Sequence, residues 1–163
     1  SRIELQEHIR PNEKVNLNDI ISHSIELHQE ILKKNNIECQ FERESKNVKI
    51  NGDRNRLIEV FNNLIDNGIK YSEKNKKITI TTKSENKNFL VTIEDQGIGI
   101  SKENIPQVTE RFFRVDPAKS KEVGGTGLGL AIVKHIVNQH RAEMTISSEI
   151  NKGTEISLNF PTI

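Results

Sequence analysis

The chain has 163 residues, of which 33% are hydrophobic and 29% charged, and its 24 basic side chains nearly balance 23 acidic ones. This length fits one domain, and the near-neutral charge argues against nucleic acid or an acidic membrane as a partner. No stretch approaches the roughly 20 apolar residues that span a bilayer, and the single cysteine, Cys39, excludes an internal disulfide. We therefore expect a cytoplasmic domain that is not itself inserted into a membrane.

The N-terminal half of the sequence predicts two long helices and three short strands. Residues 1–12 carry no clear pattern, so we expect the folded domain to occupy residues 13–163. A strand near residues 14–17 is followed by a helix that Asn18 or Asp19 would cap and that would run to about residue 35. Further strands are expected at 37–41 and 48–50. Asp53 then precedes a helix at about 54–71, in which apolar residues recur at helical spacing.

The C-terminal half predicts two alternating strands at 77–83 and 89–94, a helix at about 127–139, and a final hairpin. The hairpin strands are expected at 143–148 and 154–160, with the turn at residues 151–153. The segment between Asp95 and Gly125 has no sustained periodicity, and we interpret it as a lid. Because helices and strands do not alternate regularly, the sequence predicts an α+β two-layer sandwich with helices on one face of a sheet.

Three polar side chains share one face of the second long helix. Asn63, Asn67 and Lys70 stand at positions i, i+4 and i+7. Carboxamide oxygens can ligate Mg²⁺ and an ammonium group can neutralise phosphate, so this face suits a metal–phosphate site. A solvated polar face is the alternative, although asparagine is disfavoured inside helices.

Two glycine-rich segments follow. Asp95 opens the sequence DQGIGI directly after a predicted strand, and its carboxylate could accept a hydrogen bond from an exocyclic amine such as adenine N6. Residues 124–130 (GGTGLGL) lead into the third long helix, where exposed backbone N–H groups suit phosphate. A plain turn and a flexible hinge are the respective alternatives. The spacing matches neither a P-loop nor a dinucleotide-binding motif.

These motifs together resemble those of sensor histidine kinases. Residues 63–71 (NLIDNGIKY) resemble the N box, 95–99 (DQGIG) the G1 box, 110–116 (ERFFRVD) the F box, and 125–130 (GTGLGL) the G2 box. The resemblance implies the Bergerat ATP-binding fold, which these kinases share with Hsp90, gyrase and the mismatch-repair ATPases. It implies a mixed sheet under three main helices, with ATP and Mg²⁺ held between the helices and a flexible lid.

The resemblance also assigns roles to single residues. It implies that Asn67 ligates Mg²⁺ with support from Asn63, that Lys70 contacts phosphate, and that Asp95 holds adenine N6. Arg114, at the end of the F box, matches a position that can reach the γ-phosphate, so Asn63, Lys70 and Arg114 form the expected catalytic set. The other expected nucleotide-binding residues are Tyr71, Gly97, Gly99, Gly125, Thr126, Gly127, Leu128 and Gly129.

The sequence departs from the family pattern at a few positions. Gly68 stands where alanine is common, and Arg141 with Ala142 replaces the usual glycine-containing end of the third helix, which leaves its capping open. No histidine lies in the family's phosphoacceptor motif; the five are His8, His23, His28, His135 and His140. We therefore expect the phosphoacceptor on a separate dimerisation domain, with residues 1–12 as the tail of its last helix or a linker.

Three functions remain to be weighed. The resemblance favours a protein-histidine kinase domain that acts in two-component signalling, with its own dimerisation domain and a response regulator as partners and a parent protein anchored in the cell membrane. An ATP-hydrolysing switch would need a glutamate to activate water, and the corresponding position holds Asn63, whose amide is a poor base. A regulatory nucleotide-binding module or a protein-serine kinase of the anti-sigma type is the third alternative. The isolated domain is expected to bind ATP without phosphorylating itself.

Overall fold

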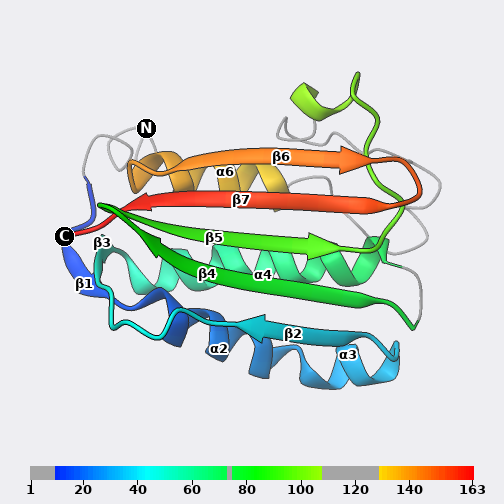
Figure 1. The fold of residues 1–163 in the computed structure, drawn as a ribbon, viewed down its shortest axis with the longest axis horizontal. Helices are drawn as coiled ribbons and strands as arrows, with labels where there is room; N and C mark the ends of the chain where they lie inside the picture. Colours follow the sequence, from blue (N-terminus) through cyan, green and yellow to red (C-terminus); the bar gives the residue numbers. More distant parts are fainter. Residues whose placement is uncertain (1–9, 73–74, 108–128) are drawn as a thin grey trace.

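Alternating apolar residues give the central sheet one buried face. In the computed structural model, which describes residues 10–72, 75–107 and 129–163, five strands lie in the order β2–β4–β5–β7–β6 (Figure 1). Along β4, Ile78 and Ile80 are fully buried, while Thr79 between them points to the other face. The strands are β2 (Glu38–Glu42), β4 (Lys77–Glu85), β5 (Asn88–Asp95), β7 (Gly153–Pro161) and β6 (Glu143–Glu149).

The sheet is mixed and its helices cover one face. Only β2 and β4 run parallel, and every other neighbouring pair is antiparallel. Helix α4 (Arg54–Tyr71) lies between α2 (Leu17–Leu27) and α6 (Gly129–Gln139) in the helical layer (Figure 1). The expected α+β two-layer sandwich with three main helices is therefore confirmed. The smaller elements are α3 (Gln29–Lys34), a 3₁₀ turn at Ile105–Gln107, and an antiparallel pair of β1 (Glu13–Val15) and β3 (Ile50–Gly52).

Most predicted elements are present, with shifts of at most two residues at their ends. The second long helix has its predicted bounds, and its start is fixed by the Asp53 side chain, which accepts the Arg56 N–H at 3.2 Å and caps the helix. The third predicted helix is described from Gly129 onward, and residues 127–128 lie outside the described part of the chain. In that described part, no helix is long and apolar enough to cross a membrane.

The first long helix differs from the prediction at its start and in its middle. Its cap is Asn16, whose side chain accepts the Asp19 N–H at 3.3 Å, rather than Asn18 or Asp19. Asn18 is buried instead and accepts a hydrogen bond from the Thr82 hydroxyl at 2.7 Å. The helix is also interrupted at His28, since its ring Nδ1 donates to the Ser24 carbonyl at 2.7 Å and its backbone N–H bonds to Ile25.

The C-terminus of α6 is capped without the glycine that is usual at this position in the family. Arg141 adopts a left-handed conformation with φ of 58°. Its N–H donates to the Asn138 carbonyl at 3.1 Å, and the Ala142 N–H donates to that of Val137 at 3.0 Å. These two bonds form the closing pattern that glycine usually provides, here at a steric cost of about 1–2 kcal/mol for a side chain in that region.

His140, the residue before Arg141, links the end of α6 to the start of α4. Its side chain is 1% exposed, its Nδ1 donates to the Ile136 carbonyl at 2.8 Å, and its Nε2 accepts the Asp53 N–H at 2.9 Å. The ring also meets Phe160 edge-on. Burial lowers the pKa of His140. The neutral ring therefore satisfies both partners, whereas an imidazolium would direct a second donor at the Asp53 N–H.

We predict that the stability contributed by neutral His140 is complete above the ordinary histidine pKa of about 6.5 and is lost as pH falls toward the lowered folded-state pKa. Urea unfolding of wild type and His140→Ala between pH 5 and 8 tests this. The variant should be less stable at pH 8, because the Asp53 N–H loses its acceptor, and its stability should fall less on acidification. Equal falls in wild type and variant would contradict the assignment.

Candidate functional site

The polar face of α4 meets the first residue of α6. Asn63 and Asn67 are both half-buried on α4. A Cβ added at Gly129 would lie 3.5 Å from both Oδ1 and Nδ2 of Asn67 and 3.6 Å from Oδ1 of Asn63. The N-terminus of α6, with its N–H groups, thus begins beside the two carboxamides. Three of the predicted site residues, from motifs more than 60 positions apart, lie together here.

Lys70 continues this face one turn further along α4. Its Nζ lies 3.7 Å from Oδ2 of Asp66, and the two side chains are 31% and 43% exposed. Oδ1 of Asp66 lies 3.9 Å from Nε2 of His28, at the interruption between α2 and α3. An exposed pair of this kind contributes little stability, so the ammonium group can exchange this carboxylate for another anion at small cost.

Asp95 ends β5 on the face of the sheet that the helices cover. Its register partner on β4 is the fully buried Ile78, and a Cβ at Gly68 of α4 would lie 4.0 Å from the Asp95 Cβ. Oδ1 accepts the backbone N–H of Gly97 at 2.9 Å and that of Thr154 at 3.2 Å. Burial raises the pKa of Asp95 to about 6. The two hydrogen bonds favour the ionised form and lower the pKa, but their effect is smaller than that of burial.

Gly97 and Gly99 are required by backbone packing. A Cβ at Gly97 would lie 2.4 Å from the carbonyl oxygen of Tyr71, the last residue of α4. That oxygen accepts the Ile98 N–H at 3.2 Å, so the turn after Asp95 is fastened to the end of α4. Gly99 has φ of 75°, and a Cβ there would lie 2.1 Å from the carbonyl oxygen of Glu149. Gly97 therefore allows the turn after Asp95 to approach Tyr71, and Gly99 allows the same turn to approach the β6–β7 hairpin.

The β6–β7 hairpin contributes to the site in a way that the sequence pattern did not indicate. Residues 151–153 were predicted only as a turn, whereas a Cβ at Gly153 would lie 1.9 Å from the carbonyl oxygen of Asp95. Thr154 supplies a backbone N–H to the Asp95 carboxylate, and Ser148 accepts the Ile100 N–H at 2.7 Å. A glycine followed by threonine at a hairpin turn was the available signal, but nothing local connects it to Asp95.

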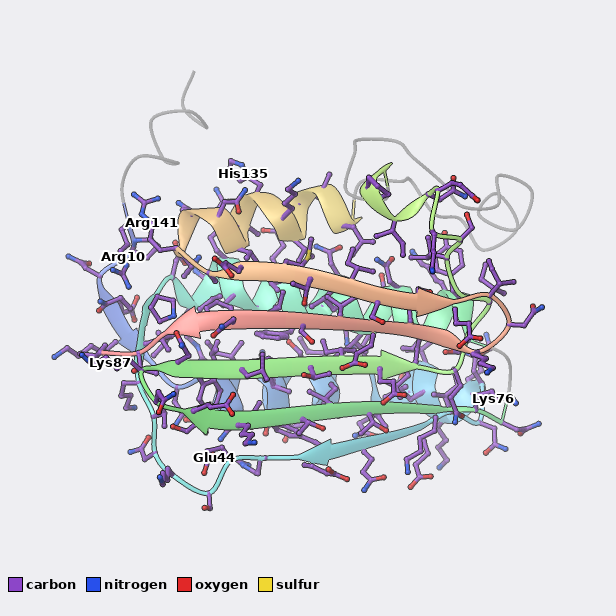
Figure 2. The ribbon with its side chains drawn as sticks, turned by 45° about the horizontal axis from the view of Figure 1, so that its top comes forward. Arg10, Glu44, Lys76, Lys87, His135 and Arg141 are labelled. Carbon is purple, nitrogen blue, oxygen red and sulfur yellow. The ribbon has the colours of Figure 1, made fainter. Side chains whose placement is uncertain are left out.

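Several predicted residues lie outside the described part of the chain. These are Arg114 with the rest of the F box, and the residues of the G2 box before its last glycine: Gly125, Thr126, Gly127 and Leu128. Their roles, and the interpretation of the preceding segment as a lid, stay predictions. Of the four histidines in the described part, His140 is structural, while His135 projects from α6 away from the sheet (Figure 2).

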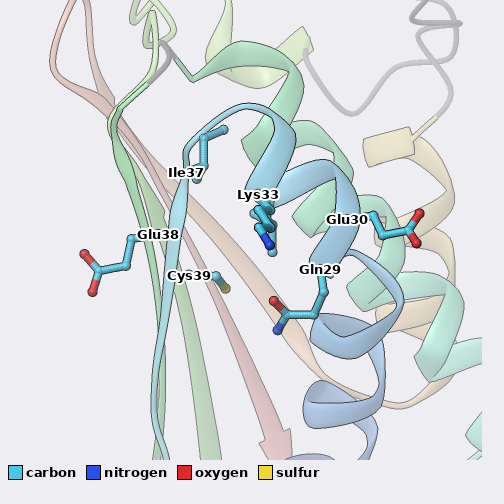
Figure 3. Close-up of a pocket in the computed structure, with 7 residues that line it drawn as sticks. Gln29, Glu30, Lys33, Ile37, Glu38 and Cys39 are labelled. Atoms are coloured by element: carbon cyan, nitrogen blue, oxygen red, sulfur yellow. The ribbon is translucent and has the colours of Figure 1, made fainter.

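A separate hollow lies at the other side of the helical layer. It has a volume of about 390 Å³ and lies between α3 and the edge strand β2, lined by Gln29, Lys33, Glu38 and Cys39 among others (Figure 3). It contains none of the predicted site residues. Burial raises the pKa of the Cys39 thiol to about 11, so that thiol is neither ionised nor a nucleophile near pH 7. We therefore place the candidate functional site at α4, α6 and the end of β5.

Comparison with known proteins places this geometry in a family. Residues 52–163 match the family described as "Histidine kinase-, DNA gyrase B-, and HSP90-like ATPase". The chain is 38% identical over 168 residues to the signal transduction histidine-protein kinase ArlS of Staphylococcus aureus. The aligned region covers 97% of this chain and 37% of ArlS. The fold and the family match define a nucleotide-binding domain built as an α+β two-layer sandwich. The chain belongs to the histidine kinase, DNA gyrase B and HSP90-like ATPase family.

Solved structures agree with this assignment. The catalytic domain of histidine kinase ThkA is 28% identical with a TM-score of 0.80, covering 91% of this chain and 94% of that one. ThkA in complex with the response regulator TrrA is 26% identical with a TM-score of 0.77, covering 93% of this chain and 42% of that one. The chain spans 37% of the length of the curated relative described above, so it corresponds to one part of such a protein.

Proposed function

We propose that this chain is the ATP-binding catalytic domain of a sensor histidine kinase, and that it transfers the γ-phosphoryl group of ATP to a histidine on a separate dimerisation domain. The observation that carries the proposal is the meeting of Asn63 and Asn67 with the start of α6 at Gly129. Family membership, the histidine kinase relatives and the Asp95 geometry support it.

The base would bind at Asp95. Within the described residues, the hydrogen bonds of this carboxylate all go to Oδ1, which leaves Oδ2 for the N6 amine of adenine. Guanine presents an oxygen at the corresponding place and would be repelled by the ionised carboxylate. Tyr71 is expected to line the nucleotide, because the turn after Asp95 is bonded to its carbonyl.

The phosphates would lie between α4 and the start of α6. Lys70 can contact a phosphate oxygen after it leaves Asp66, and the first N–H groups of α6 favour the same charge. The described part of the chain holds no group of three or more His, Cys, Asp or Glu side chains that could bind a metal. A carboxamide oxygen of Asn67, supported by Asn63, together with phosphate oxygens suits Mg²⁺, which when bound would neutralise phosphate charge.

The transfer itself needs little covalent chemistry from this domain. An imidazole nitrogen of the partner domain would attack the γ-phosphorus, a new N–P bond would form, and the bond to the β-phosphate oxygen would break to release ADP. The imidazole proton would go to a base on the partner domain. Lys70 and Arg114 would balance charge during the transfer. A response regulator would then be the next partner, and the parent protein would be anchored in the cell membrane.

Hydrolysis by the same site is disfavoured. Asn63 occupies the place where the related ATPases carry a glutamate, and an amide cannot take a proton from water. The carboxylate one turn earlier, Glu59, lies 3.7 Å from Arg56 in an exposed ion pair. Among the described residues, the site would thus hold the nucleotide without a base beside an attacking water, as a domain that passes phosphate to another domain requires.

The first prediction of this proposal is that Asp95→Asn weakens ATP binding about 10–100-fold without loss of the fold. An amide oxygen at the Oδ1 position keeps both backbone hydrogen bonds, while the Oδ2 acceptor is lost. Because burial raises the pKa of Asp95 to about 6, the ionised carboxylate lowers stability as pH rises through that value. At pH 8 the variant should therefore melt at the same or a higher temperature. Calorimetry measures both, and unchanged ATP affinity would refute the adenine assignment.

The second prediction concerns the metal. Asn67→Ala should weaken Mg·ATP binding much more than metal-free ADP binding, since only the former uses the Asn67 oxygen. Asn62→Ala is a matched control, because this asparagine is on the same helix but not on the face shared by Asn63 and Asn67. Titration with each nucleotide, with and without Mg²⁺, gives the comparison. Equal losses for the two nucleotides would make Asn67 a structural residue.

The third prediction tests the reaction. With γ-labelled ATP this chain alone should neither label itself nor release phosphate quickly, whereas it should label a histidine-bearing dimerisation domain supplied as a separate polypeptide. The label should be lost in acid, as expected for phosphohistidine, and should be absent with Asn67→Ala. Acid-stable label on the chain would favour a serine-directed kinase, and rapid phosphate release would favour an ATPase switch.

A further inference from the structure

The end of the β6–β7 hairpin holds the turn that follows Asp95. Residues 148–154, which we call the hairpin clasp, contact residues 95–100 at both ends. The Asn151 N–H donates to the Ile98 carbonyl at 2.8 Å, and the Thr154 N–H donates to the Asp95 carboxylate at 3.2 Å. Gly99 is packed against the Glu149 carbonyl so closely that no Cβ fits between them.

The Ser148 hydroxyl is at the centre of the clasp, and all its hydrogen-bonding capacity is used. Its oxygen accepts the Ile100 N–H at 2.7 Å and lies 2.8 Å from the Thr154 hydroxyl oxygen. Its O–H group donates to the Gly153 carbonyl at 2.9 Å. A hydroxyl group has one donor and two acceptor positions. Since its proton goes to Gly153, the Thr154 hydroxyl must be the donor in the third contact. One oxygen atom thus joins three backbone segments.

These contacts form a short path from Ser148 to Asp95. Ser148 pairs with Thr154 across the two strands, on the face of the sheet that carries Asp95. The Thr154 hydroxyl donates to the Ser148 oxygen, and the Thr154 backbone N–H donates to the Asp95 carboxylate. At the other end of the turn, Ser148 holds Ile100, which is only 8% exposed.

We propose that Ser148 is a positioning residue for nucleotide recognition, because its hydroxyl fixes residues 95–100 and Thr154 around the carboxylate that receives the adenine amine. The inference rests on the proposed function and extends it to a residue that does not touch the nucleotide. Its consequence is specific: loss of the hydroxyl should weaken adenine recognition more than phosphate binding, since the Asn63–Asn67–Gly129 region lies on other elements.

The chain offers a matched control one position away. Ser147 is on the same strand but points to the opposite, exposed face of the sheet, opposite Glu155. Ser147→Ala removes an identical hydroxyl without touching the clasp. Ser148→Thr keeps the hydroxyl and tests rescue. Ser148→Cys, whose sulfur is a weak hydrogen-bonding group of similar shape, serves if Ser148→Ala does not fold.

The experiment measures dissociation constants for Mg·ATP and Mg·GTP with this chain, well below the melting temperature of each variant. Ser148→Ala should reduce the preference for ATP over GTP by about tenfold, the equivalent of one well-placed hydrogen bond. Ser147→Ala and Ser148→Thr should keep the preference. Amide hydrogen exchange at Ile100 should be faster in Ser148→Ala and unchanged in Ser147→Ala. A purely structural role would lower the melting temperature and weaken both nucleotides equally.

The outcomes separate this inference from the proposed function. If wild type prefers ATP, and Ser148→Ala or Ser148→Cys has the same preference, Ser148 has no positioning role and the inference is wrong. If wild type itself shows no preference, while Asp95→Asn changes nothing, the adenine assignment fails and the inference fails with it. A lost preference that Ser148→Thr restores supports the assignment of the hydroxyl.

Discussion

The arrangement of the candidate site depends on one half-buried carboxylate, Asp95, whose described hydrogen bonds reach only one of its two oxygens. Asp95 has backbone N–H groups on one oxygen, from Gly97 and Thr154, while its burial raises the pKa to about 6. A carboxylate in such surroundings is stabilised further by any donor that reaches its second oxygen. The close approach of α4 at Gly68, the turn at Gly97 and the hairpin beyond β5 all serve to hold this group in place.

Helix α4 packs into the hydrophobic core with one face and contributes candidate site residues from another. Leu57, Phe61 and Leu64 are buried on one side and pack into the core, which fixes the helix against the sheet. The residues on the other side can then be polar without loss of stability, and Asn63 and Asn67 meet α6 there. Gly129 has no side chain to fill the space between them. The apolar stripe therefore sets the position of the polar one.

Local patterns predicted the elements because each depends on neighbours in sequence. The Asp53 cap and the apolar spacing that follows it were sufficient for α4. The predicted cap of the first helix was wrong, because Asn18 forms a tertiary hydrogen bond with Thr82, 64 positions away. The Thr154–Asp95 contact spans 59 positions and uses a backbone N–H that any residue would have, so no local signal could indicate it.

Two titratable groups lie near the ends of α4, the buried His140 and the half-buried Asp95, and they differ in which of their hydrogen-bonding atoms have partners. His140, near its start, has a partner on each ring nitrogen, and its lowered pKa means that folding favours the neutral ring. Asp95, near its end, has a raised pKa, so the fold favours the protonated acid. On raising the pH, the fold therefore gains stability through His140 and loses it through Asp95. Both ring nitrogens of the histidine have partners within the protein, whereas the described hydrogen bonds leave the second oxygen of the Asp95 carboxylate without a donor. The proposed binding of the adenine amine would use that open oxygen.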